Sequence, residues 1–224
     1  KAFPLNTFRN VKYVNKKYIA VGKSGIILIS SDGDKWSSTT NSDSNTILDV
    51  TYGNNTYIAV GENGTILISS DALTWTTAAS GLTNNGTLVD LGGVTYGNNT
   101  FIAVGPANYL YGYILTSSDG SSWTSRTSGT SWSLFDVIYA NNIFIATGSG
   151  GTIISSSDGI TWTSRTSGIM STSHSGINIT YGNNKFVGLA VDSGKNITTS
   201  SDGITWTPST WYNSNGNSGI TYGN

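Results

Sequence analysis

The sequence predicts an all-β protein, a β-propeller of five four-stranded blades, and two repeated phrases carry this prediction. The phrase Ser-Ser-Asp-x-x-x-Trp occurs five times, and its Asp residues are 39, 48, 39 and 44 residues apart. A second phrase, clearest as TYGNNTYIAVG at residues 51–61, precedes each copy by about twenty residues. No segment keeps a 3.6-residue apolar period, so we expect essentially no helix.

The second repeat shows how a blade is built from its sequence. The strands, rich in β-branched and aromatic residues, are expected at 48–52, 56–60, 65–69 and 74–77. The turn Gly53–Asn55 separates the first two strands, and its Gly and Asn tolerate positive φ. The Asp phrase forms the turn between strands three and four, and residues 79–90 cross to the next blade.

We expect one domain, residues 1–224, because the repeats cover the chain. The blades are predicted at about 9–46, 47–90, 91–133, 134–174 and 175–217, followed by an extra strand at 218–224. That last segment is a sixth copy of strand one, so one copy is surplus in a closed five-blade ring. Six blades, or a fragment of a longer repeat array, remain the alternatives.

The phrase Ser-Ser-Asp-Gly-x-Thr-Trp resembles the Asp-box, or BNR repeat, of sialidase-like and photosystem II assembly factor-like propellers. It has one residue fewer between Asp and Trp than the usual box, and Ala72 replaces Gly in the second copy. The resemblance implies a structural turn between strands three and four, away from the active face. The residues assigned to this structural role are Asp32, Asp71, Asp119, Asp158, Asp202, Trp36, Trp75, Trp123, Trp162 and Trp206.

Elementary chemistry supports the same structural interpretation of the phrase. A short Asp side chain accepts hydrogen bonds from the N–H groups of its own turn, and Gly permits left-handed backbone. We expect each Trp to pack between blades and to find an acceptor for its N–H.

Ligand-binding residues are expected on the opposite face, where the copies differ in length and content. The third repeat inserts four residues in GPANYLYGY, and the crossings add further aromatic and amide groups. The candidates are Trp132, Trp211, Tyr212, Tyr109, Tyr111, Asn84, Asp49 and Asp136. Aromatic rings stack on sugars while amides and carboxylates bind hydroxyls, so a lectin-like, carbohydrate-binding module is the main hypothesis. Trp132 and Trp211 filling gaps between blades is the alternative.

A protein-docking scaffold is the second hypothesis, and a glycoside hydrolase is the third. Hydrolysis would need two nearby carboxylates, for which Asp49, Asp136 and Asp90 are the candidates, with Glu62 nearby. Capping the crossings is the alternative role of Asp49 and Asp136. The resemblance to sialidases implies a three-Arg clamp with a Tyr–Glu pair. Arg126 and Arg165 occupy the same repeat position in different blades, and Glu62 is the only Glu, so we expect no enzyme.

Composition narrows the range of partners. The net charge is −1 and only 10% of residues are charged, so we expect neither nucleic acid binding nor membrane insertion. The chain has no Cys, and no metal or cofactor motif is visible. A glycan or a surface protein is the expected partner. The low-charge surface suggests a secreted, cell-surface or virion-surface location, and the lysines of the first repeat are expected to solvate a terminal blade.

Overall fold

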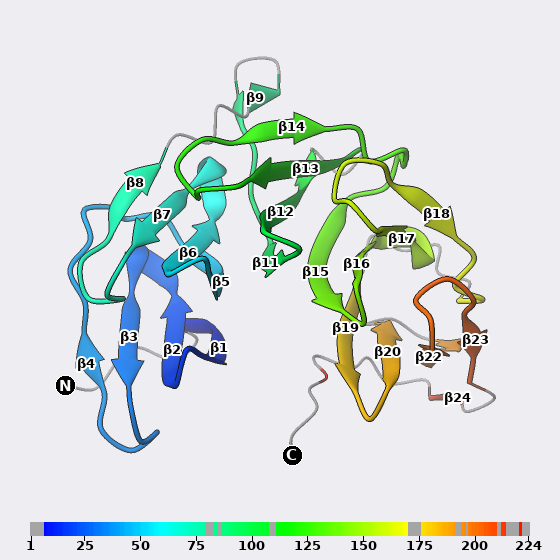
Figure 1. Ribbon diagram of the computed structural model, residues 1–224, viewed down its shortest axis with the longest axis horizontal. Coiled ribbons are helices and arrows are strands. Elements are labelled where there is room, and N and C mark those ends of the chain that lie inside the picture. The colour runs from blue at the N-terminus through cyan, green and yellow to red at the C-terminus, as the bar shows by residue number, and fades with distance from the viewer. Residues whose placement is uncertain are drawn as a thin grey trace. The chain divides into compact units, whose positions relative to one another are not determined.

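The computed structural model describes residues 7–78, 83–84, 87–107, 111–169, 176–190, 194–195, 197–209, 212–213 and 220. The chain is all-β and forms five four-stranded antiparallel sheets, each built from consecutive strands of one repeat (Figure 1). In the part of the chain that is described, the helical elements are three short 3-10 turns, Lys23–Gly25, Glu62–Gly64 and Ser149–Gly151. The predicted fold class and the near absence of helix are therefore confirmed.

The first sheet contains β1 (Phe8–Val14), β2 (Lys17–Gly22), β3 (Ile27–Ser30) and β4 (Ser37–Ser38). The second contains β5 (Ile47–Gly53), β6 (Thr56–Gly61), β7 (Ile66–Ser69) and β8 (Thr76–Ala78). The third contains β11 (Gly93–Gly97), β12 (Thr100–Ala107), β13 (Tyr111–Ser117) and β14 (Thr124–Arg126). The fourth contains β15 (Leu134–Ala140), β16 (Ile143–Gly148), β17 (Ile153–Ser156) and β18 (Thr163–Arg165). The fifth contains β19 (Ile177–Gly182), β20 (Lys185–Ala190), β22 (Ile197–Ser200) and β23 (Thr207–Pro208).

The contacts divide the chain into two compact units, each treated by itself below. One is Lys1–Ala103 with Ser117–Thr124, and the other is Val104–Thr116 with Ser125–Asn224. The first unit holds the first two sheets, the second holds the last two, and the third sheet contributes residues to both.

A β-bulge shapes the start of strand one in three sheets. The pairing register shifts between Phe8 and Asn10, between Ile47 and Asp49, and between Leu134 and Asp136. A bulge bends its strand and re-aims the side chain beside it. Asn10, Asp49 and Asp136 therefore emerge at equivalent places in their sheets. The fifth sheet keeps an unbroken register from Ile177 to Gly182.

The turns between strands one and two depend on pairs of left-handed residues. Asn54 and Asn55 have φ of 45° and 57°, and Asn-Asn pairs do the same in the next three repeats, with Asn15 and Lys16 in the first. Positive φ at both central positions is the type I′ geometry that matches strand twist. Gly53 has another function, because a Cβ there would come within 2.0 Å of the Tyr96 ring.

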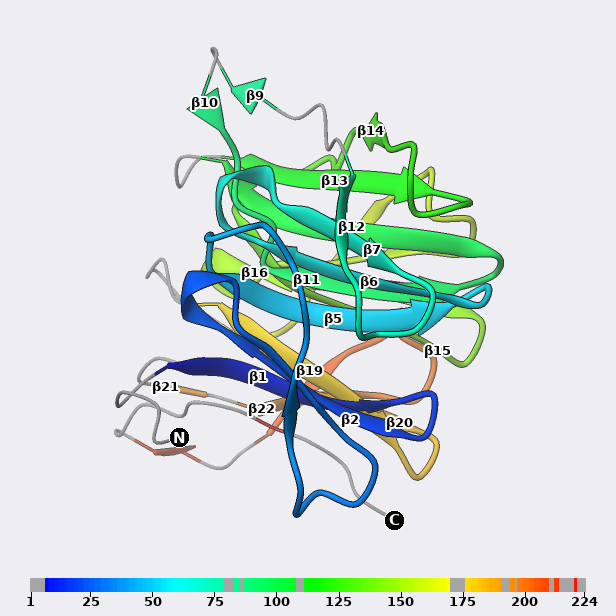
Figure 2. The same cartoon turned by 90° about the vertical axis from the view of Figure 1, so that its left-hand side faces the viewer.

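Two further sheets of two strands each lie in segments that the sequence predicts only as crossings or loops. In the second crossing β9 (Thr83–Asn84) pairs with β10 (Thr87–Leu88), a hairpin labelled in Figure 2. In the last repeat β21 (Gly194–Lys195) pairs with β24 (Tyr212–Asn213). The inserted residues of the third repeat lengthen β12 and β13. The predicted extra strand at 218–224 lies outside the described residues, apart from Ile220.

The core forms where one sheet stacks on the next. In the first unit, Ile19 and Val21 of β2 and Ile27 and Ile29 of β3 pack against the second sheet. Their partners are Ile47, Val50, Tyr57, Ala59, Leu67, Ala72 and Trp75. In the second unit, Ile145 and Ile153 of the fourth sheet belong to one cluster with residues of the fifth, including Ile179, Phe186 and Trp206. Alternation along each strand thus supplies two apolar faces per sheet.

Candidate functional site

The five Asp phrases fold as self-contained turns with one hydrogen-bond pattern. In the fourth copy, Asp158 Oδ1 accepts hydrogen bonds from the N–H groups of Ile160 and Thr161, both at 2.8 Å. The Ser156 hydroxyl donates to the same oxygen and accepts from Gly159 N–H. Trp162 Nε1 donates to the Gly159 carbonyl at 3.1 Å. The carboxylate and the indole N–H are both used inside the turn, as the sequence-based interpretation anticipates.

These hydrogen bonds also hold the carboxylates in their charged form. Donation by the N–H groups of Thr205 and Ile204, followed by the Ser200 hydroxyl, lowers the pKa of Asp202 to about 2. The same arrangement of backbone donors lowers the pKa of the other four aspartates, Asp32, Asp71, Asp119 and Asp158. A carboxylate held in this way is a poor proton donor near neutral pH.

A ladder of three aromatic rings crosses each sheet beside its Asp phrase. In the second sheet Tyr52, Tyr57 and Trp75 follow one another, with ring centroids 4.5 and 6.4 Å apart. Equivalent ladders occur in the other four sheets, for example Tyr181–Phe186–Trp206 in the fifth.

The Trp residues of the ladder differ in exposure, which corrects the expectation that each packs between blades. Trp75 and Trp206 are 3% and 7% exposed, whereas Trp36 is 38% exposed. The first sheet packs over Trp75 of the second sheet, and residues of both sheets form one core cluster. In the first sheet, Trp36 instead lines an apolar hollow and stays partly accessible.

Asp49, a candidate for ligand binding or hydrolysis, is buried and fully engaged by neighbouring groups. It is 2% exposed, and Lys12 Nζ lies 2.7 Å from its Oδ1. Asn10 Nδ2 donates to Oδ1 at 2.8 Å, and the N–H of Val94 donates to Oδ2 at 2.9 Å. The carboxylate therefore ties the first, second and third sheets together at the start of strand one.

Asp136 makes the corresponding tie in the second unit. Its Oδ1 accepts from Val137 N–H at 2.8 Å, and its Oδ2 accepts from Ile179 N–H of the fifth sheet at 3.1 Å. Asp136 is half-buried. Both candidate carboxylates thus contact the first strand of the following sheet.

Trp132 is the rim aromatic whose side chain the structure describes. It is 39% exposed, and its ring lies over the 3-10 turn of the fourth sheet, where a Cβ on Gly150 would be 2.8 Å from the ring. One ring face is therefore covered while part of the side chain reaches solvent. Tyr109 and Trp211 lie outside the described residues, and only the strand positions of Tyr111, Tyr212 and Asn84 are described.

The two equivalent arginines are each bound within their own sheet. Arg126 Nε donates to the Thr116 hydroxyl at 3.0 Å, and Arg165 Nε donates to the Ser155 hydroxyl at 2.7 Å. Among the described residues, no group of three or more His, Cys, Asp or Glu side chains could hold a metal ion. The helices of the described segments are all too short and polar to cross a membrane.

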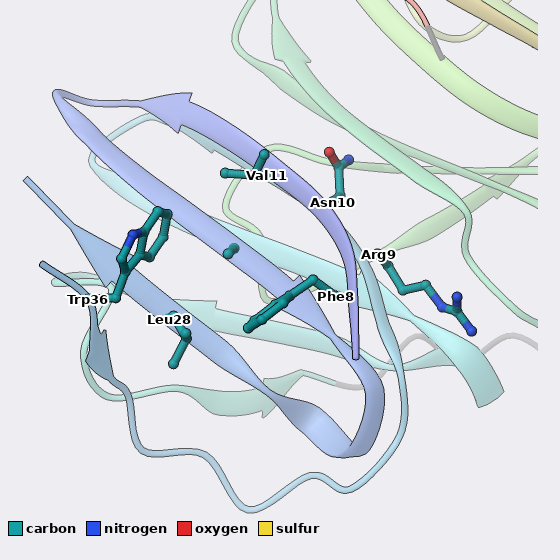
Figure 3. Close-up of a pocket in the computed structure, with 7 residues that line it drawn as sticks. Phe8, Arg9, Asn10, Val11, Leu28 and Trp36 are labelled. Carbon is teal, nitrogen blue, oxygen red and sulfur yellow. The ribbon is translucent and has the colours of Figure 1, made fainter. Parts of the chain in front are cut away.

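An apolar hollow lies on one face of the first sheet, at residues that the sequence did not single out as a site. It has a volume of about 670 Å³ and is lined by Phe8, Val11, Leu28 and Trp36, with Arg9 and Asn10. Figure 3 shows the four apolar side chains over this sheet and Arg9 directed away from them. Phe8 and Val11 are 41% and 57% exposed. The sequence signal was available, because these residues align with buried positions of the second repeat, Ile47 and Val50.

No protein-family model and no curated protein matches the chain. Among solved structures it is similar to "YCF48 bound to D1 peptide", with 16% identity over 94% of this chain and 70% of that chain and a TM-score of 0.62. It is similar to YCF48 from Cyanidioschyzon merolae, with 21% identity, 94% and 74% coverage and a TM-score of 0.61. The computationally designed Ika8 protein matches with 12% identity, 97% and 78% coverage and a TM-score of 0.57.

These similarities, together with the five repeated sheets, define the class of the protein as a β-propeller repeat protein. At this level of identity they speak for the fold alone.

Proposed function

We propose that the chain is a non-enzymatic protein-docking module, which binds a partner polypeptide in the apolar hollow of the first sheet. The observation that carries the proposal is the exposure of Phe8, Val11 and Trp36 together around a hollow of about 670 Å³. Exposed aromatic and aliphatic groups that cluster on one face favour a protein partner. The polar groups at the edge, Arg9 and Asn10, resemble the rim of such an interface.

Two further observations support docking. One similar structure, YCF48, is described as bound to D1 peptide, so this fold can present a polypeptide-binding surface. Asp49, a candidate for hydrolysis, has both oxygens engaged by Lys12, Asn10 and Val94, which leaves it poorly suited to contact a substrate. A secreted, cell-surface or virion-surface location would bring such a module to other proteins.

The test is a selection from a displayed peptide library on the immobilised chain, followed by titration of the selected peptides. We expect peptides rich in aliphatic and aromatic residues. Val11→Asp should weaken their binding by about tenfold or more, because the docked state buries the new carboxylate. Ile160→Asp is the matched control, since Ile160 is 54% exposed in the Asp phrase of the fourth sheet and does not line the hollow. Peptides that bind the Val11→Asp variant as tightly as the wild type would overturn docking in this hollow.

Carbohydrate binding is the second candidate function, and the partial exposure of Trp132 favours it. The ring is held over the turn at Gly150, so a sugar could stack on its open part without first ordering a loose side chain. A glycan array probed with the wild type and with Trp132→Ala tests this candidate. Loss of specific signals in the variant supports glycan binding, and an array without any binder eliminates it.

A further inference from the structure

We propose that two equivalent grooves, centred on Arg126 and Arg165, bind successive anionic groups of an acidic polysaccharide. The chemistry of these groups is that of a carboxylate or a sulfate, in which two or more oxygens share the negative charge. The proposal concerns the second unit and goes beyond the docking function, since neither arginine lines the hollow of the first sheet. Both arginines occupy the third position after the Trp of an Asp phrase, within the identical stretch Trp-Thr-Ser-Arg-Thr-Ser-Gly at residues 123–129 and 162–168.

The Arg165 groove lies between the last strand of the fourth sheet and the Asp phrase of the fifth. It has a volume of about 370 Å³, at the low end of the range of about 300–1,000 Å³ that is usual for ligand pockets. One side is lined by Ser164, Arg165 and Thr166, and the other by Ile204, Thr205 and Trp206. Ser164, Thr166 and Thr205 are exposed, so the walls offer hydroxyl groups to a ligand that carries hydroxyls of its own.

The guanidinium of Arg165 is oriented by one buried hydroxyl and keeps its other donors available. Arg165 pairs with Ile153 across β17 and β18, so its side chain shares a face with Ile153 and Ser155, the face that packs against the fifth sheet. Its Nε donates to the Ser155 hydroxyl at 2.7 Å. Among the described residues, the half-buried guanidinium makes no ion pair and no second hydrogen bond. Such a fork can donate two parallel hydrogen bonds to one anionic group.

Arg126 repeats this arrangement in the third sheet. Its Nε donates to the buried Thr116 hydroxyl at 3.0 Å, and Thr116 occupies the position of Ser155, three residues before the Asp of the phrase. Arg126 is also half-buried, and within the described ranges it makes no other hydrogen bond and no ion pair. The chain after Arg126 runs along the next Asp phrase, because a Cβ on Gly129 would lie 3.9 Å from the Trp162 carbonyl oxygen. Each arginine therefore has an orienting hydroxyl in its own sheet and an Asp phrase beside it.

The other three sheets show that the fold does not require an arginine at this position. The equivalent residues are Thr39 in the first sheet, Ala78 in the second and Ser209 in the fifth. The orienting hydroxyl is also replaced in the first two sheets, by Ile29 and Ile68, while the fifth sheet keeps a threonine there. The pair of an arginine and its orienting hydroxyl thus occurs only in the third and fourth sheets. A cation that the sheet can omit, but that is oriented where it is present, indicates a binding role.

The repetition and the lining of the grooves favour a polysaccharide over a single anion. Stacked sheets lie about 10 Å apart, so a polymer with regularly spaced anionic groups can occupy both grooves and gain affinity from the second contact. Besides its hydroxyls, the groove has Ile204, which is 47% exposed and offers an apolar contact to the face of a sugar ring. The net charge of −1 provides no general attraction for polyanions, so their binding depends on these two guanidinium groups.

The test is calorimetric titration of the full chain with dextran sulfate, polygalacturonate and uncharged dextran. We expect at least one acidic polymer to bind and dextran not to bind, and the two acidic polymers distinguish a sulfate from a carboxylate as the preferred group. Arg126→Gln and Arg165→Gln should each weaken binding by about tenfold, and the double variant by about a hundredfold, because each change removes a charge-assisted fork. Added salt should weaken binding of the wild type.

Lys185→Gln is the matched control, because it removes one positive charge from an exposed position of the same unit that does not line the groove. It should bind the polymers like the wild type. Arg165→Lys keeps the charge and should still weaken binding, since an ammonium group cannot donate two parallel hydrogen bonds in a fork. Circular dichroism checks the fold of each variant, and we expect native spectra because the second sheet carries Ala78 at the same position. Arg126→Lys and Arg165→Lys decide the question if a Gln variant does not fold.

Several outcomes would overturn the proposal. One is the absence of binding to both acidic polymers, and another is binding that the double arginine variant retains. Poly-glutamate that binds more tightly than either polysaccharide, and that loses affinity in the double variant, would assign the grooves to an acidic polypeptide instead. Polymer binding that is lost in Trp132→Ala and kept in the double variant would place the sugar at Trp132. Val11→Asp should bind the polymers like the wild type, so failure of docking in the hollow and failure of these grooves are separate results.

Discussion

Lys12 Nζ of β1 lies 2.7 Å from Oδ1 of the buried Asp49 in β5, and this ion pair joins the first sheet to the second. The same carboxylate accepts from Val94 N–H, so three successive sheets meet at one side chain. Because Lys12 is one-third exposed and Asp49 is buried, the free energy of the pair depends mainly on the desolvated carboxylate.

Replacing Asp49 by Ala should destabilise the protein by about 2–4 kcal/mol, because the Lys12 ammonium and the Val94 N–H lose their acceptor. Urea denaturation measures the change. Lys12→Met provides the comparison and should cost a similar amount, because it leaves the buried Asp49 carboxylate without its cation and with only its bonds from Asn10 and Val94. An unchanged denaturation midpoint for Asp49→Ala would show that this tie is energetically neutral.

Alanine substitution at two equivalent glycines should give unequal losses of stability. Gly33 and Gly120 have similar φ, 83° and 78°, so the backbone strain from a Cβ is similar in both, about 1 kcal/mol. At Gly120 the Cβ also collides with Ile58, which adds overpacking of about 1–3 kcal/mol. Thermal unfolding should therefore give a lower melting temperature for Gly120→Ala than for Gly33→Ala. Equal melting temperatures in the two variants would contradict the collision expected at Gly120.

Stability should decline as the pH falls from about 4 toward 2. The pKa of Asp202 is lowered from 3.8 to about 2 in the folded protein, and the pKa values of the other four turn aspartates are also lowered. A lowered folded-state pKa stabilises the protein above the unfolded-state value, and this contribution is lost as the pH falls through the folded-state value. Melting temperatures across this range provide the measurement. A melting temperature that stays constant between pH 4 and 2 would contradict this role of the turns.

Removing the buried serine of an Asp phrase should matter more than removing its exposed neighbour. Ser200 is 3% exposed, donates to Asp202 Oδ1 and accepts from Gly203 N–H. Ser200→Ala leaves both groups short of a partner and should cost about 1–2 kcal/mol. Ser201→Ala changes an exposed hydroxyl and should stay within about 0.5 kcal/mol of the wild type. Chemical denaturation of the two variants side by side distinguishes them.

The sequence predicts the sheets well because strands and turns depend on local chemistry. The alternation of apolar and polar residues predicts a strand at 48–52, and β5 extends one residue beyond this range at each end. The Asn pairs mark the left-handed turns. The hydrogen bonds of Asp158 lie within a few residues of it, so a short repeated phrase contains all the necessary information.

The site was harder to predict because it depends on contacts between sheets. Trp36 and Trp75 occupy equivalent positions in nearly identical phrases, yet their exposed fractions differ more than tenfold. The difference comes from what lies against each sheet, which the phrase does not encode. Likewise Lys12, expected to solvate a terminal blade, bonds to a carboxylate 37 residues away.

The two faces of every sheet are different, which gives the repeat a direction. Duplicating one repeat inside the gene would add a sheet that already carries both halves of its contacts, such as the Ile19 side and the Val50 side of the first interface. The number of repeats can therefore grow or shrink in evolution without inventing a new interface.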